Sequence, residues 1–65
     1  MSKFVWYADD GKIAVLSAWH GVGPALDMIA RDTGRPRAGF DYLGVRNITV
    51  MGGEVMSAHV FKPKI

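Results

Sequence analysis

The chain has no cysteine and only two histidines among its 65 residues. The absence of cysteine excludes disulfide bonds, thiolate zinc sites and a cysteine nucleophile, and it is typical of proteins in a reducing compartment. A domain of this length buries only about 60% of its unfolded surface. Small domains without covalent or metal cross-links often gain stability by self-association. We therefore expect no metal and no cofactor, and we consider a homodimer.

Long apolar runs are also missing. No stretch approaches the roughly 20 residues that a membrane span requires. The apolar segment after Met1 is interrupted by Asp9-Asp10, which makes it too short for the core of a leader peptide. Eight basic and six acidic residues are interleaved and leave a formal charge of +2, which permits binding to nucleic acid without indicating it. We expect a single domain over residues 1–65, located in the cytoplasm.

What the chain does contain is a pattern of two hairpins around one helix. Strands are predicted over 3–8 and 13–19, and over 45–51 and 54–62, where β-branched residues flank turn signals. Between them, Pro24 suits the start of a helix over 23–33, and Gly34 suits its end. Residues 35–44 are predicted to form a loop. The expected fold class is α+β, with a small antiparallel sheet of two hairpins, in ββαββ order, packed against a single helix.

The first hairpin is apolar on both faces. A two-residue turn at Asp10-Gly11 would place Trp6 opposite Val15 and Val5 opposite Leu16. Three large rings then share the face that we expect to form the core, namely those of Phe4, Trp6 and Trp19. Because one helix covers one face, the other face is predicted to be exposed and to bind a partner or a second copy. That face carries Val5, Tyr7, Ala14, Leu16 and Ala18.

The faces of the second hairpin are harder to assign. With Gly52-Gly53 as a two-residue turn, Ile48 and Val50 share a face with His59, and Val45 shares the opposite face with Val60. Neither face is clearly polar. A slip of one residue would exchange them, so the buried face stays open at this point.

Four arginines lie in and beside the predicted loop, at positions 31, 35, 37 and 46, with Phe40 and Tyr42 among them. Arginine and tyrosine are typical of protein-binding hot spots. Arginine beside aromatic rings also holds phosphates and stacks on bases, so a nucleic-acid site using Arg31, Arg35, Arg37 and Arg46 is the alternative. A solvated loop whose rings close the end of the core is the third interpretation.

Other constellations favour structural interpretations. Gly21-Val22-Gly23 precedes a helix, but Pro24 removes an amide donor, so a helix entry turn fits better than a phosphate loop. Asp9-Asp10 suits turn chemistry. His20 and His59 are the residues that titrate near neutral pH, and Ser17, Asp27 and Ser57 are their nearest partners in sequence. No nucleophile motif surrounds these serines, so an enzyme assembled across an oligomer interface is the least favoured hypothesis.

The segment Pro36-Arg37-Ala38-Gly39-Phe40, after one hairpin and one helix and before a further strand, is similar to small phage proteins that inhibit host enzymes. The resemblance implies a chain that acts by occupying the surface of another protein. We therefore predict a small non-catalytic protein-binding module, with a host protein or a second copy as partner. The predicted contact residues are Val5, Tyr7, Leu16, Arg35, Arg37, Phe40 and Tyr42. High salt would weaken the nucleic-acid alternative steeply and an apolar interface hardly at all.

Overall fold

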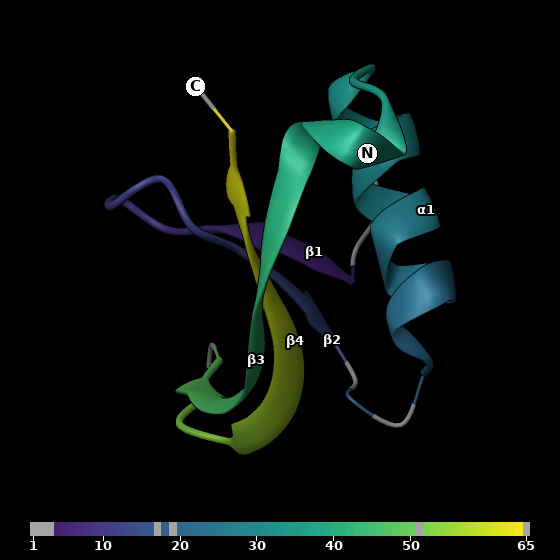
Figure 1. The fold of residues 1–65 in the computed structure, drawn as a ribbon. Coiled ribbons are helices and arrows are strands. Elements are labelled where there is room, and N and C mark those ends of the chain that lie inside the picture. The colour runs from purple at the N-terminus through teal and green to yellow at the C-terminus, as the bar shows by residue number, and fades with distance from the viewer. Residues whose placement is uncertain (1–3, 17, 19, 51, 65) are drawn as a thin grey trace.

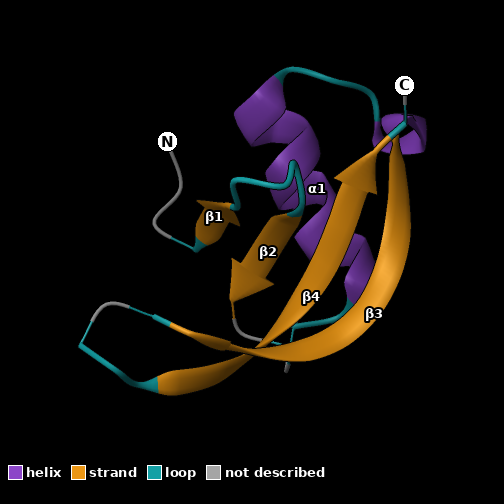
Figure 2. Cartoon of the chain, turned by 90° about the vertical axis from the view of Figure 1, so that its left-hand side faces the viewer, coloured by secondary structure: helices purple, strands orange, loops and turns teal. Residues whose placement is uncertain are grey.

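The computed structural model describes residues 4–16, 18, 20–50 and 52–64, which form one long helix packed on one antiparallel sheet (Figure 1). The elements are β1 (Val5–Tyr7), β2 (Ile13–Leu16), α1 (Val22–Thr33), the 3₁₀ turn η1 (Arg37–Gly39), β3 (Phe40–Thr49) and β4 (Val55–Pro63). The strands lie in the order β1-β2-β4-β3. Figure 2 shows α1 on one face of the sheet and the long hairpin of β3 and β4 extending beyond it. The predicted α+β class, with one helix and a four-stranded antiparallel sheet, is confirmed.

Both hairpin turns are one residue longer than predicted. Ala8 N–H donates to the Lys12 carbonyl at 2.9 Å, and Gly11 N–H donates to the Ala8 carbonyl at 3.1 Å. The same pair of bonds joins Val50 to Glu54 at 2.8 Å and Gly53 to Val50 at 3.0 Å. Gly11 and Gly53 have φ of +89° and +82°, values that only glycine adopts at little cost. A turn closed by glycine in this conformation is the common three-residue alternative to the predicted two-residue turn.

The longer turn changes the register of the first hairpin and corrects the prediction of its faces. Val5 lies opposite Val15 and Tyr7 opposite Ile13, so these four apolar side chains share the face that α1 covers. Val5 is therefore 7% exposed and belongs to the core, and Leu16, on the opposite face, is 6% exposed. The prediction that Val5 and Leu16 lie on a free surface is wrong. Tyr7, which was predicted to lie on the same surface, is 51% exposed.

The predicted core rings also need correction. Phe4 is exposed and Trp6, whose side of β1 points away from α1, is only partly buried. Trp19 lies outside the described residues. The core consists instead of aliphatic side chains and two phenylalanines, with Leu26 and Met28 packed against them: Val5, Ile13, Val15, Ala25, Ile29, Phe40 and Phe61. Full burial of a side chain such as Ile29 or Phe61 contributes about 1.5–3 kcal/mol.

The helix follows the prediction closely. Gly21 precedes its first residue, Val22, and the first helical bond runs from Ala25 N–H to the Gly21 carbonyl at 3.1 Å. Pro24 lies in the first turn, where no intrahelical partner exists for its missing N–H. Gly34 ends the helix in the left-handed conformation, with its N–H bonded to the Ala30 carbonyl. None of the helices in the described ranges has the length and apolar character needed to cross a bilayer.

The prediction of a loop over 35–44 is wrong for residues 40–44, because β3 begins at Phe40. Phe40 pairs with Pro63 and Tyr42 with Phe61, and the pairing resumes after a bulge with Gly44 opposite Val60. The glycine that indicated a loop is part of this bulge, which shifts the register without ending the strand. The strand therefore brings Phe40 to the end of the sheet where α1 finishes.

Candidate functional site

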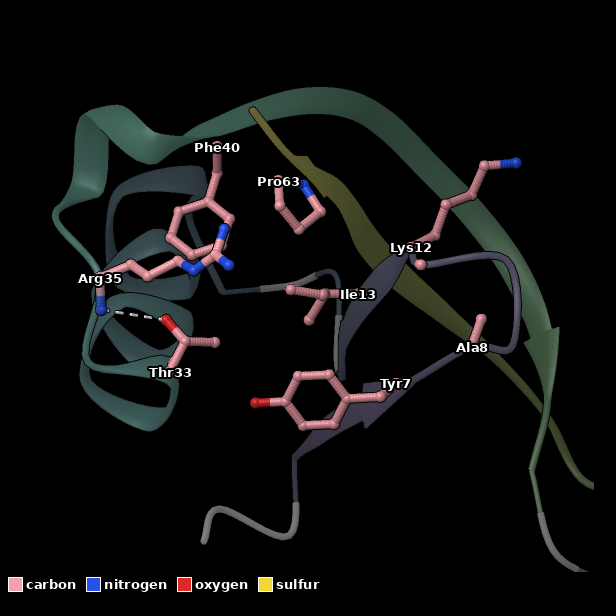
Figure 3. A pocket seen from close by; sticks show the side chains of 9 residues that line it. Tyr7, Ala8, Lys12, Ile13, Thr33, Arg35, Phe40 and Pro63 are labelled. Carbon is pink, nitrogen blue, oxygen red and sulfur yellow. Dashed lines mark hydrogen bonds between the residues drawn. The ribbon is translucent and has the colours of Figure 1, made fainter. Parts of the chain in front are cut away.

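A pocket of about 380 Å³ lies at this end of the sheet (Figure 3). It is bounded by the β1–β2 turn, the C-terminal end of α1, the start of β3 and the end of β4. We name it the Tyr7 pocket; it is lined by Tyr7, Ala8, Gly11, Lys12, Ile13, Thr33, Arg35, Phe40 and Pro63. The first hairpin, the segment over 33–40 and the end of β4, which are distant from one another in sequence, thus meet at one cavity.

The inner surface of the pocket is apolar. Ile13 and Phe40 are buried core residues that reach the cavity from β2 and β3, and Pro63 adds its ring from β4. Tyr7 borders the same cavity from β1, and its hydroxyl donates a hydrogen bond to the Asp32 carboxylate of α1. This bond raises the pKa of Tyr7 to about 12, because the neutral phenol is the donor and the adjacent carboxylate disfavours a second negative charge. The hydroxyl is thereby used within the protein, and the half-exposed ring contributes apolar surface.

Most polar groups of the lining are also engaged. Lys12 Nζ lies 3.3 Å from Asp10 Oδ2. The backbone N–H of Lys12 donates to Asp10 Oδ1 at 3.0 Å, and this bond is the main reason why the pKa of Asp10 is lowered. Thr33 Oγ1 donates to the Ile29 carbonyl at 2.7 Å and accepts from Arg35 N–H at 3.3 Å. By contrast, no ion pair is formed by the Arg35 guanidinium with any residue that the structure describes.

The structure gathers some of the predicted contact residues and separates others. Tyr7, Arg35 and Phe40 border the pocket together. Arg37 lies nearby on η1 but is ion-paired, with Nε 3.1 Å from Asp27 Oδ1 of α1. Tyr42 is the second residue after Phe40 in β3 and packs against Phe61, with ring centroids 5.2 Å apart. Val5 and Leu16 are buried and take no part in this surface.

The four arginines of the nucleic-acid alternative do not form one patch. Arg46 lies opposite Ala58 in the β3–β4 pair, and Ala58 is next to His59, which faces the α1 side. Arg46 therefore points to the face of the sheet away from α1, because side chains alternate along a strand. Arg31, Arg35 and Arg37 lie on or just after the helix.

His59 is a buried residue whose ring is held from both sides. Its Nε2 lies 2.5 Å from the His20 carbonyl, and its Nδ1 lies 2.9 Å from the Tyr42 hydroxyl. A carbonyl only accepts, so Nε2 carries the proton, and in the neutral ring Nδ1 accepts from Tyr42. Ser57 bonds to Asn47, and Ser17 lies outside the described residues. In the described part of the chain, His, Asp and Glu side chains form no group of three suited to a metal ion.

Sequence reasoning missed several pocket residues, notably Ile13, Thr33 and Pro63. Thr33 and Arg35 were close to a predicted helix end, but Pro63 becomes a neighbour of Ile13 only through the pairing of β4 with β2. That pairing between distant segments leaves no local signal in the sequence. Compared with known proteins, the chain matches no family model, no curated protein and no solved structure.

Proposed function

We propose that the chain is a non-catalytic protein-binding module whose contact site is the Tyr7 pocket and its rim. The observation that carries this proposal is the convergence on one cavity of Tyr7, from β1, with Arg35 and Phe40, from the stretch that joins α1 to β3. Tyrosine and arginine are enriched among the residues that dominate binding energy at protein interfaces. Their convergence on an apolar cavity gives a concave surface with both apolar area and charge.

The size of the pocket fits this role. Its volume of about 380 Å³ lies at the low end of the range of about 300–1,000 Å³ for ligand pockets. It suits one large side chain of a partner, with the neighbouring partner residues lying across the rim. Occupation of a partner's surface in this way would block that surface.

The hydrogen bonds of the candidate catalytic residues support binding over catalysis. Both ring nitrogens of His59 are engaged by Tyr42 and by the His20 carbonyl. The hydroxyl of Ser57 donates to Asn47, on an exposed part of the sheet. A general base must reach the proton that it abstracts, and neither of these groups borders the Tyr7 pocket.

The test is a selection of peptides from a displayed random library on the purified protein, followed by affinity measurements on two matched variants. Ala8→Trp introduces a bulky ring at the pocket, and Val45→Trp introduces the same ring at an exposed position of β3 outside it. Selected peptides should bind A8W about tenfold more weakly or worse, and V45W within about twofold of the original chain. Peptides that lose affinity for V45W and keep it for A8W would contradict the proposal.

A nucleic-acid outcome is distinguished by the same material. Labelled single-stranded and duplex oligonucleotides should bind only weakly, and A8W should not change that binding. Tight oligonucleotide binding that falls steeply with salt would instead assign the function to the arginines, because phosphate contacts release counterions. Replacement of Arg31 or Arg46 by glutamine would then weaken binding, although neither lines the pocket.

A further inference from the structure

We infer that the Tyr7 pocket selects a carboxylate carried next to an apolar side chain of a peptide, with the carboxylate paired to Arg35. This inference rests on the proposed function and deepens it, because it specifies the chemistry of the partner segment that enters the same site. It follows from a comparison of the polar groups that line the pocket: most of them already bind another group of the chain, and the Arg35 guanidinium forms no ion pair with the described residues.

The polar groups of the lining leave one charge uncommitted. The Tyr7 hydroxyl is bound to Asp32, Lys12 to Asp10, and Thr33 both donates and accepts within the chain. Arg35 uses its backbone N–H toward Thr33, but its guanidinium has no ion-pair partner among the described residues. Among the lining residues, the charged group without an ion-pair partner in the described chain is therefore a guanidinium, which binds a carboxylate through two parallel N–H donors.

The apolar lining limits what else the ligand carries. Ile13 and Phe40 are buried in the core, and Pro63, Ala8 and the Tyr7 ring complete an apolar wall. A small anion without an apolar group would leave this apolar wall in contact with water. A carboxylate attached to an aromatic or branched apolar group covers the wall and reaches Arg35 at once, and the release of water from the wall favours its binding.

Arg37 provides an internal comparison. It lies two residues from Arg35, yet Asp27 of α1 is 3.1 Å from its Nε. Arg37 therefore has a carboxylate from its own chain, and it does not line the pocket. No carboxylate of the described residues forms an ion pair with the Arg35 guanidinium, and the Asp32 carboxylate near the pocket accepts a hydrogen bond from Tyr7. The difference between the two arginines is the reason to assign anion recognition to Arg35.

The experiment compares hydrocinnamate with hydrocinnamamide, two probes of the same size and apolar group, of which the first carries an anionic carboxylate and the second a neutral amide. Amide chemical shifts of the isotope-labelled full chain report binding at Ala8, Gly11 and Thr33. Hydrocinnamate should bind the original chain about two- to fivefold more tightly than the amide, as expected for a partly exposed charge pair. Arg35→Gln should abolish this difference. Arg31→Gln, which removes an exposed helical charge outside the pocket, should preserve it.

Two results would overturn the inference. Equal affinity of the two probes, with shifts confined to the pocket, would show that the site binds apolar groups without a preference for carboxylate. No shift at the pocket with either probe would show that it does not recognise this chemistry at all. Neither result decides the proposed function, which depends on whether the displayed peptides lose affinity for A8W. A peptide that binds the pocket through uncharged side chains would separate the two conclusions.

Discussion

The two ends of the sheet both expose apolar side chains, but they differ in shape and in charge. At one end, Tyr7 is 51% exposed beside a cavity that also contains Ile13 and an uncommitted Arg35. The other end is the distal hairpin, residues 45–50 and 54–57, where Val45 and Val55 are 55% and 63% exposed on one face. Figure 1 shows that the tip of this hairpin lies away from α1.

Exposed apolar area alone therefore does not identify a binding site. The distal hairpin exposes more of its valines than the pocket end exposes of Tyr7, but its polar pair Ser57–Asn47 is already bonded. The pocket end combines an apolar wall, concave shape and one uncommitted charge. Single exposed valines are ordinary on protein surfaces, whereas a concave apolar surface with a charged rim is typical of a recognition site.

The largest effect should come from the core that supports the pocket. Phe61 is 1% exposed and lies opposite both Ile13 and Tyr42, so Phe61→Ala should cost about 3–5 kcal/mol of unfolding free energy. Val55→Ala, on the distal hairpin, should change it by less than about 0.5 kcal/mol. Urea denaturation followed by tryptophan fluorescence measures both. Similar losses for the two variants would contradict the described difference in burial.

The two turn glycines allow a sharper comparison. Gly11→Ala and Gly53→Ala each force a side chain into the left-handed region, which should cost about 1–2 kcal/mol in either hairpin. Only Gly11 lines the pocket, so only G11A should also weaken the binding of selected peptides. Thermal unfolding combined with peptide titration makes the test. A loss of peptide affinity in G53A that matches the loss in G11A would place the contact elsewhere.

The hydrogen bonds of the two regions should differ in energetic importance. Tyr42→Phe leaves the buried Nδ1 of His59 without its donor and should cost about 1–2 kcal/mol. Ser57→Ala removes the exposed bond to Asn47 and should cost less than about 0.5 kcal/mol. Urea denaturation at neutral pH distinguishes them. Equal stabilities of Y42F and the original chain would show that the His59 ring is not held as described.

The smallest effect concerns the ionisation of Tyr7. Its pKa is raised from 10.0 to about 12 in the folded chain by the bond to Asp32, so the neutral form stabilises the fold. This contribution is present below pH 10 and is lost as the pH rises to about 12; because Tyr7 is half exposed, it should stay below about 1 kcal/mol. Tyrosinate absorbance in a Tyr42→Phe background follows Tyr7 alone. Asp32→Asn should move the midpoint back toward 10, and an unchanged midpoint would exclude the bond.

Part of this molecule could be predicted from local sequence signals. Gly34 correctly marked the end of the helix, and the two turns and the β-branched segments predicted an α+β fold. The registers were wrong because Gly11 and Gly53 each close a three-residue turn, and one extra residue moves every side chain of the pairing. Gly44 suggested a loop because glycine is common both in loops and at β-bulges, and here it belongs to a bulge.

The candidate site was predictable only in part, because it depends on the order of the strands in the sheet. Arg35, Phe40 and Tyr7 were noticed as residue types that bind partners, but their convergence depends on β4 lying between β2 and β3. In that order Phe61 of β4 lies opposite Ile13 of β2 and belongs to the same core cluster as Ile29 of α1, a pairing that no local pattern encodes. Val5 was assigned to a free surface because the predicted register was wrong, whereas Leu16 lies on the predicted face, away from α1, and is buried there.

The most direct test of whether the Tyr7 pocket is the contact site is to map the amide chemical shifts of the full chain on addition of a peptide selected from the displayed library. We expect the largest changes at the Tyr7 pocket, at Ala8, Gly11, Thr33 and Arg35, and little change in the distal hairpin at Val45 and Val55. Changes concentrated on the distal hairpin, with the pocket amides unmoved, would contradict it and show that the exposed valines form the binding surface.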